Sequence, residues 1–177
     1  MAALAVIVAL GAYIEAIRLA GNIHAVVPGR FYRSAQLDRS QFARVITQDT
    51  IRSILNLRGA HPTASWYEDE LAVAGSLGVT HYDFGLSATH MVTTAQIDSI
   101  LTIIRRAPKP ILVHCQGGAD RSGLVSAIYA AMIVGQSTQR ADRQFSLKYG
   151  HFPWLGSKTW AMDSSYWAYV RGNHNLR

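Results

Sequence analysis

The only cysteine of this 177-residue chain lies in a segment whose residue types could bind and attack a phosphate group. Residues 114–123 read HCQGGADRSG, so five residues separate Cys115 from Arg121, and two of the five are glycines. Glycine can turn its backbone N–H inward without a Cβ clash, so a loop of this length can surround one tetrahedral oxyanion. The predicted phosphate-binding loop consists of Gln116, Gly117, Gly118, Ala119, Asp120 and Arg121.

The elements on either side of this loop predict its electrostatics. A short apolar run, residues 110–113, precedes it, and a helix-like stretch, residues 124–134, follows it. If the loop joins a strand end to a helix N-terminus, the first-turn N–H groups and the helix dipole favour an anion there. The same field favours the thiolate form of Cys115, and Arg121 adds a planar fork of donors that matches two phosphate oxygens. Ser122 could donate its hydroxyl to the sulfur as it leaves a phosphocysteine, or act as a plain helix N-cap.

On these residues the chain resembles the Cys-x5-Arg phosphatases, specifically the compact dual-specificity branch of the protein tyrosine phosphatase superfamily. The resemblance implies two-step phosphoryl transfer through a cysteinyl-phosphate, with no metal and no other cofactor. It also implies an α/β fold with a central, mostly parallel β-sheet flanked by helices. Low-molecular-weight phosphatases and arsenate reductases carry their cysteine loop near the N-terminus, whereas about two thirds of this chain precedes it. A rhodanese loop and a non-catalytic, phosphate-binding pseudophosphatase are the alternatives.

The general acid is less clearly defined than the nucleophile. The resemblance implies an Asp on a loop roughly thirty residues before the cysteine, where it protonates the leaving oxygen. Asp83 has this separation, but it stands in an expected strand, and the matching loop contains His90 and no carboxylate. Asp120 is the second candidate, with the orientation of Arg121 as its structural alternative. The expected order is therefore Asp83, Asp120 and then His90.

Composition fits one catalytic domain that acts on an anionic substrate. The hydrophobic content of 49% excludes general disorder, and the net charge of +6 suits anionic substrates or an anionic membrane surface. No nucleic-acid motif is present, and a single cysteine excludes an intramolecular disulfide. The expected substrate is a protein carrying phosphotyrosine, phosphoserine or phosphothreonine. A phospholipid such as phosphatidylglycerophosphate or a phosphoinositide is the alternative, although the loop has no lysine, which weighs against highly phosphorylated inositols.

The N-terminal segment is strongly apolar. Residues 1–14 contain no charge, and Glu15 and Arg18 then interrupt the pattern. A full membrane span needs about twenty apolar residues, so three alternatives remain: the tail of a membrane anchor, an amphipathic helix on the catalytic domain, or an uncleaved signal anchor. Residues 21–37 resemble the segment that follows a hydrophobic helix in bacterial membrane-associated relatives. We therefore expect membrane attachment through residues 1–20, on the periplasmic side of the inner membrane, with a cytoplasmic location as the alternative. The expected domains are a possible anchor, 1–21, and a catalytic domain, 22–177.

Strand and helix patterns alternate along the catalytic domain. The expected strands are residues 30–35, at a sheet edge, then 51–57, 79–84 and 110–113. The expected helices are residues 38–47, capped by Asp38, then 65–77, 94–106, 124–134, 137–149 and 158–170. Sequential strand–helix units imply parallel strands with right-handed crossovers, and ligands bind at the carboxyl ends of such strands. Cys115 lies at one of these ends.

Two further groups of residues are singled out. Arg33 is expected to pair with a carboxylate in the core, and Arg58, after a sheet strand, to border the rim of the active site. Lys148 and His151 could bind a second phosphate, with solvent exposure as the simpler alternative. Four aromatic residues near the C-terminus are expected to pack in the core or between helices, with a lipid-facing rim as the alternative: Phe152, Trp154, Trp160 and Trp167.

Overall fold

The structure is a computed structural model that describes residues 1–152 and 158–174. Within these residues the strands β1 (His24–Val27), β2 (Phe31–Ser34), β3 (Ser53–Asn56), β4 (Thr80–Asp83) and β5 (Ile111–His114) form one sheet in the order β1-β2-β5-β3-β4. The helices are α1 (Ala2–Leu19), α2 (Arg39–Gln48), α3 (Ser65–Ser76), α4 (Thr94–Arg106), α5 (Arg121–Met132), α6 (Thr138–Ala141) and α7 (Trp160–His174). Two 3-10 turns, η1 (Asp142–Gln144) and η2 (Leu147–Tyr149), follow α6. All strand pairs are parallel except β1–β2, so the predicted α/β class with a mostly parallel sheet is confirmed.

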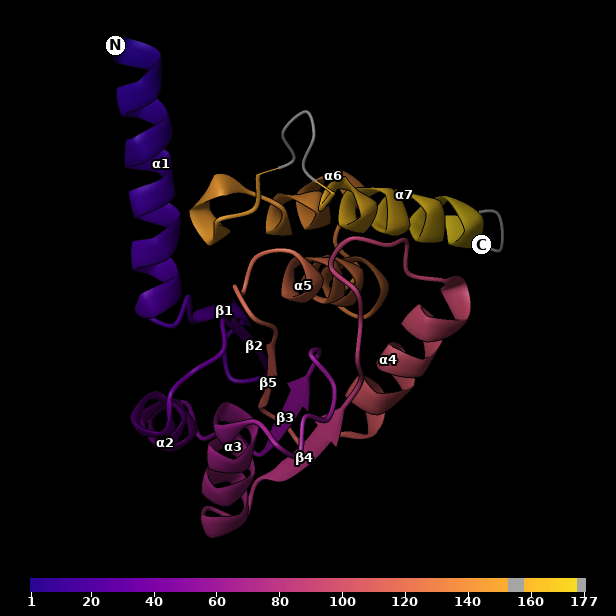
Figure 1. Ribbon diagram of the computed structural model, residues 1–177. Helices are drawn as coiled ribbons and strands as arrows, with labels where there is room; N and C mark the ends of the chain where they lie inside the picture. Colours follow the sequence, from indigo (N-terminus) through magenta and orange to yellow (C-terminus); the bar gives the residue numbers. More distant parts are fainter. Residues whose placement is uncertain (153–157, 175–177) are drawn as a thin grey trace.

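Helices cover both faces of the sheet (Figure 1). Because side chains alternate along a strand, Ile111 and Val113 of β5 pack toward α4, α5 and α7. Leu112, between them, packs on the opposite face toward α2 and α3. The same alternation places His114 on the α2 and α3 face, where its ring lies edge-on to Phe42. The residue after it, Cys115, belongs to the core cluster of the α4 and α5 face.

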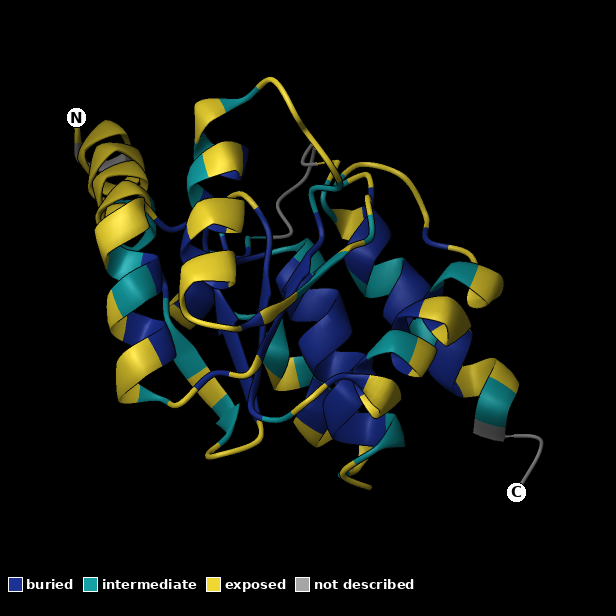
Figure 2. Ribbon diagram, turned by 90° about the horizontal axis from the view of Figure 1, so that it is seen from below, coloured by how far each residue is buried: buried dark blue, intermediate teal, exposed yellow. Residues whose placement is uncertain are grey.

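Helix α5 is the buried centre of the second layer. All of its residues from Ser122 to Ala131 are buried, and Figure 2 shows this helix almost wholly in the colour of buried residues. It begins at Arg121, six residues after Cys115, and Cys115 directly follows β5. The expected sequence of strand, loop and helix around Cys115 is therefore the observed one.

Two details of the sheet and the helices differ from expectation. The strand that was expected at a sheet edge, β2, lies inside the sheet, because β1 turns back at Pro28 and Gly29 and pairs outside it. The helix expected over residues 137–149 is divided into α6, η1 and η2. Arg33 of β2 reaches into this segment, where its Nη1 donates to the carbonyl of Gln144 at the end of η1.

The C-terminal aromatic residues do not form one core group. Trp160 is 55% exposed, so a place for it in the core is wrong. Trp167 is half-buried and packs against the core, and Phe152 is also half-buried. Trp154 lies outside the described residues.

Helix α1 lies at the edge of the molecule (Figure 1), and most of it is coloured exposed in Figure 2. Its Ile14 and Ile17 lie against Gly150, and Tyr13 Oη is 3.4 Å from the carbonyl of Lys148. Across the residues that the structure describes, no helix has both the length and the apolarity needed to cross a membrane.

Candidate active site

The predicted nucleophile lies buried between β5 and α5. Cys115 is only 2% exposed, and its Sγ is 3.5 Å from Ser122 Oγ. Asp120, not Ser122, is the residue that precedes the first helical position of α5, so the N-cap alternative for Ser122 is wrong. Ser122 is fully buried, and the sulfur is its hydroxyl's partner. This geometry leaves the hydroxyl free to stabilise a negative charge on sulfur.

The carbonyls of the loop point outward and are held by residues from distant segments. The carbonyl of Gln116 accepts from the backbone N–H of Gln36 at 3.1 Å, and that of Gly117 accepts from Asn22 Nδ2 at 3.0 Å. In a trans peptide the next N–H points away from the carbonyl, so these contacts turn the following amides toward the inside of the loop. Among the described residues, the N–H groups of residues 116–121 have no acceptor. The loop is therefore a ring of free donors of the kind that binds an oxyanion.

Arg33 is the main support of this ring. Its Nη2 donates to the carbonyls of Gly118 and Ala119 at 2.8 and 2.9 Å, and its guanidinium stacks 4.1 Å above the ring centre of Tyr149. The predicted carboxylate partner is thus wrong, since Arg33 bonds to carbonyls. Burial lowers the pKa of Arg33 to about 10, although the charges of Tyr149 and Cys115 oppose the shift. The side chain stays cationic at neutral pH and lies directly behind the loop.

Gly118 allows the loop to approach β2 closely. Its φ is +70°, a left-handed conformation that favours glycine. A Cβ at this position would lie 2.6 Å from the backbone nitrogen of Ala35. Glycine is therefore required here by both conformation and space.

Arg121 connects the loop to the ends of two strands. Its Nη1 donates to the carbonyls of Leu57, after β3, and Leu86, after β4, at 3.3 and 3.1 Å. Its Nε is buried and has no acceptor among the described residues. One edge of the guanidinium is thus anchored, while another keeps donors for the oxygens of a phosphate.

A buried carboxylate that the sequence analysis missed supports His114. Glu70 of α3 accepts from His114 and His81 through Oε1, both at 2.8 Å, and from Gln36 Nε2 through Oε2 at 3.0 Å. Burial would raise the pKa of Glu70, but the charge of His114 and these hydrogen bonds outweigh it and lower the pKa to about 2. The sequence contained a signal for this burial. Glu70 is three residues from both Tyr67 and Val73, so it lies on the same buried side of α3.

Asp83 is held in a hydrogen-bonded cluster beside α3. It ends β4, and its carboxylate accepts from Tyr67 Oη and from Asn56 Nδ2. Burial and the bond to Asp83 raise the pKa of Tyr67 to about 12. Register pairs Asp83 with Asn56 and Asn56 with His114, so Asp83 faces the α2 and α3 side of the sheet. Cys115 faces the other side.

His90 lies in the exposed loop between β4 and α4. Its Nδ1 is 2.8 Å from Ser87 Oγ and 3.3 Å from Thr89 Oγ1. These are contacts within the loop itself. The segment between β4 and α4 contacts the phosphate-binding loop through a different residue, Leu86, whose carbonyl accepts a hydrogen bond from Arg121.

Asp120 forms a charge cluster with a buried histidine and the C-terminal helix. Its Oδ1 is 2.8 Å from His151 Nδ1, and His151 Nε2 is 3.0 Å from Asp163 of α7. Burial would lower the pKa of His151, but the hydrogen bonds to Asp120 and Asp163 outweigh it and raise the pKa to about 9. His151 is buried, so the solvent exposure expected as the simpler alternative is wrong for it, and both of its ring nitrogens are already occupied by carboxylates. Oδ2 of Asp120 has no partner among the described residues.

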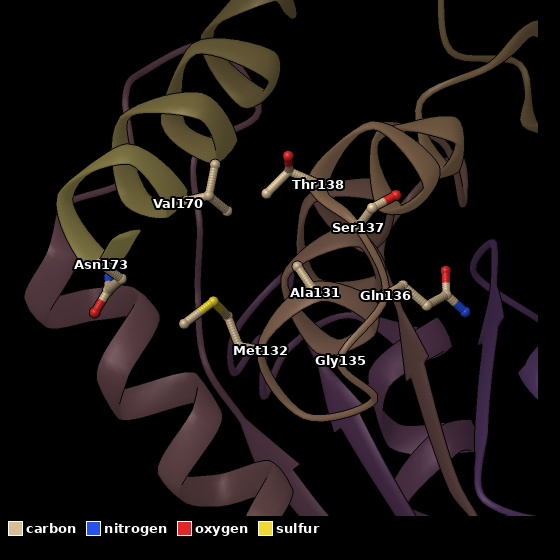
Figure 3. Close-up of a pocket in the computed structure, with 8 residues that line it drawn as sticks. All are labelled: Ala131, Met132, Gly135, Gln136, Ser137, Thr138, Val170 and Asn173. Atoms are coloured by element: carbon tan, nitrogen blue, oxygen red, sulfur yellow. The ribbon is translucent and has the colours of Figure 1, made fainter. Parts of the chain in front are cut away.

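Two hollows differ in their relation to this loop. A pocket of about 310 Å³ adjoins it, because Gln116 lines the pocket together with Arg58 and Trp66. Arg58 therefore borders the site as the sequence predicted. A smaller hollow of about 90 Å³ lies at the other end of α5, between Met132 and Val170 (Figure 3). Its lining contains no charged side chain, and one length of α5, about 16 Å, separates it from the loop.

Comparisons with known proteins agree with this geometry. Residues 21–161 match the family model described as Swiss Army Knife protein, DSP-PTPase phosphatase domain. TpbA of P. aeruginosa superposes with a TM-score of 0.62 at 20% identity, over 85% of this chain and 92% of its own, and a TpbA variant is known in complex with pTyr. The catalytic core of the PP-IP phosphatase Siw14 of S. cerevisiae gives 0.62 at 20% identity, over 87% and 93% of the two chains. PTPMT1, also known in complex with PI(5)P, gives 0.60 at 14% identity, over 86% and 99%. At such identities the likeness shows the fold alone. Among curated proteins, none matches this sequence.

Proposed function

The chain belongs to the Swiss Army Knife family of DSP-PTPase phosphatase domains, and on that premise we propose that Cys115 is the nucleophile of a cysteine-based phosphatase. Its sulfur forms a bond to phosphorus while the bond from phosphorus to the ester oxygen breaks, and that oxygen takes up a proton. Water then attacks the phosphocysteine, and sulfur leaves as a thiolate next to the Ser122 hydroxyl. The observation that carries the proposal is the ring of outward carbonyls and free amides around Cys115.

For the general acid we propose Asp120 ahead of Asp83. Asp120 lies within the phosphate-binding loop, and its Oδ2 is free of partners among the described residues while Oδ1 contacts His151. Asp83 has both carboxylate oxygens occupied, by Asn56 and Tyr67, on the side of the sheet that faces away from Cys115. The free oxygen in the loop is therefore the better placed of the two to donate a proton, which Asp120 must take up before the ester bond breaks.

The test is hydrolysis of a series of aryl and alkyl phosphates in the presence of EDTA. We expect turnover without added metal and inhibition by vanadate. Asp120→Asn should lower kcat for alkyl phosphates by about 10²-fold and for 4-nitrophenyl phosphate only slightly, because a good leaving group needs no proton. Asp83→Asn serves as the matched carboxylate control, and its effect should not depend on the leaving group.

Two outcomes would contradict these assignments. No turnover of any phosphate ester by the unmodified protein would leave only phosphate binding and support the pseudophosphatase alternative. An equal loss of rate across the whole series in Asp120→Asn would show that Asp120 supports the loop and donates no proton.

For the substrate we propose a phosphorylated protein, with phosphotyrosine, phosphoserine or phosphothreonine. The complex of a TpbA variant with pTyr supports this choice by analogy. A phospholipid is the second candidate, favoured by the complex of PTPMT1 with PI(5)P and by the exposed apolar surface of α1. The lack of lysine in residues 116–121 weighs against highly phosphorylated inositols.

We also propose that residues 1–20 attach the domain to a membrane, with the periplasmic side as the expected one. The support is the exposed apolar side chains around α1, of which Leu4, Val6, Ile7 and Val8 are 62–66% exposed. The double variant Val6→Asp, Ile7→Asp should lose cosedimentation with anionic lipid vesicles. Leu77→Asp, at an exposed leucine that follows α3, is the control and should sediment like the unmodified protein. Unmodified protein that stays in the supernatant would rule this attachment out.

A further inference from the structure

The pocket beside the phosphate-binding loop is built from parts of the chain that are far apart in sequence. It has a volume of about 310 Å³, which is large enough for part of a small molecule. Its lining includes Arg18 from the end of α1, Gln36 and Asp38 after β2, Arg58 after β3, Trp66 of α3 and Gln116 of the loop. A substrate whose phosphate lies in the loop can therefore extend into this pocket.

Arg58 presents a positioned guanidinium in this pocket. It lies 3.5 Å above the ring centre of Trp66, and its Nη1 donates to Gln36 Oε1 at 2.9 Å. Its Nε and Nη2 have no acceptor among the described residues, and no carboxylate there forms an ion pair with it. The stacking holds the plane of the fork while leaving donors free, which suits a carboxylate or a phosphate.

The other charged groups of the pocket are already compensated. Arg18 forms a two-bond ion pair with Glu15, with nitrogen–oxygen distances of 2.6 and 2.9 Å. Asp38 caps α2, where its carboxylate accepts from the N–H of Gln41 and the hydroxyl of Ser40. Arg58 is thus the cation whose charge is not balanced by a carboxylate within the pocket.

Arg58 is also close enough to the reacting groups to sense their charges. Burial and then the positive charge of Arg121 lower the pKa of Arg58, while the negative charges of Glu70 and Cys115 raise it. An anion bound at Arg58 would reduce the repulsion between the two guanidinium groups. The loop and the pocket therefore form one positively charged surface with two places for an oxyanion.

We infer that the pocket binds a second oxyanion of the substrate, a carboxylate or a phosphate, through the guanidinium of Arg58 while the reacting phosphate contacts Cys115. The inference rests on the proposed function and narrows the substrate class to phosphomonoesters that carry a second anionic group. A phosphomonoester without this group binds through the loop alone.

Matched aryl phosphates test the inference. Carboxyphenyl phosphates, with the carboxylate at each ring position, are compared with the corresponding carbamoylphenyl phosphates, which are neutral at that group. We expect kcat/KM of the unmodified protein to favour the best carboxylate isomer by about tenfold over its amide. Arg58→Gln should bring the ratio close to one, and Arg58→Lys should retain part of it. Arg52→Gln, which removes an exposed arginine at the opposite end of β3, should leave the ratio unchanged.

The outcomes separate the pocket from the proposed function. Absence of turnover with every ester contradicts the phosphatase assignment itself. Turnover with a ratio near one for all isomers in the unmodified protein overturns the second oxyanion site and leaves the phosphatase intact. A preference for carboxylates that persists in both Arg58 variants assigns the anion to another group and also overturns the inference. The comparison of carboxyphenyl with carbamoylphenyl phosphates uses the unmodified protein, so it tests the inference even if a variant fails to fold.

Discussion

Cys115→Ser is expected to lower kcat for 4-nitrophenyl phosphate by at least about 10⁴-fold, which corresponds to about 5.5 kcal/mol in the barrier. A serine hydroxyl stays protonated unless a base activates it. In the structure the side chain that contacts residue 115 is the hydroxyl of Ser122, which is not a base. The amide ring and Arg121 do not depend on the sulfur. The variant should therefore still bind vanadate or phosphate, with an affinity measured by calorimetry.

Ser122→Ala provides the comparison, because it removes the sulfur's neighbour and keeps the nucleophile. We expect phosphocysteine to accumulate in this variant, seen as a burst of nitrophenol in rapid mixing, since loss of the hydroxyl slows the departure of sulfur. Turnover of Cys115→Ser within tenfold of the unmodified protein would show that sulfur does not attack phosphorus.

The phosphate-binding loop could be predicted because the information is local. The glycines, the cysteine and the arginine are within ten consecutive residues, and the strand and helix that flank them have clear patterns. The support of the loop could not be predicted in the same way. Asn22 and Arg33 reach its carbonyls from 95 and 85 residues away in the chain. Such contacts depend on the order of strands in the sheet, which a single sequence does not determine.

The general acid shows the limit of arguments from spacing. Asp83 has the expected separation from the cysteine, but a strand alternates its side chains between faces, and register places Asp83 with His114 on the α3 side. The strand itself was predicted correctly, and only the position of Asp83 relative to Cys115 was not. The helix expected over residues 137–149 is divided into α6, η1 and η2, and a buried arginine from β2 donates to the carbonyl of Gln144 within this segment. Contacts of this kind come from distant parts of the chain, so a local helical pattern does not reveal them.

His151 illustrates a residue type that spacing alone cannot interpret. The sequence allows solvent exposure or phosphate binding, whereas the structure buries the ring between Asp120 and Asp163. A histidine with both nitrogens bonded to carboxylates carries a positive charge, in agreement with its pKa of about 9. It connects the phosphate-binding loop to α7, a helix that was expected from the sequence but whose neighbours were not.

Arg121→Lys is expected to lower kcat/KM for aryl phosphates by about 10³-fold, even though the charge is kept. Arg121 uses Nη1 to contact the carbonyls of Leu57 and Leu86, and its buried Nε remains free. Lysine has a single nitrogen, so it can bind the carbonyls or the phosphate but cannot span both with the same planar geometry. Its loss should appear in both KM and kcat, because the fork binds the phosphate in the ground state and binds the more highly charged equatorial oxygens of the transition state more strongly.

Arg143→Lys is the matched control, since Arg143 is exposed and has no contact with the phosphate-binding loop in the structure. Its steady-state constants should equal those of the unmodified protein. Thermal unfolding of Arg121→Lys should show whether the two carbonyl contacts also stabilise the fold, and adding inorganic phosphate should raise its Tm less than that of the unmodified protein. A kcat/KM within a few-fold of the unmodified value would mean that a point charge suffices at this position, and the bidentate role of Arg121 would have to be abandoned.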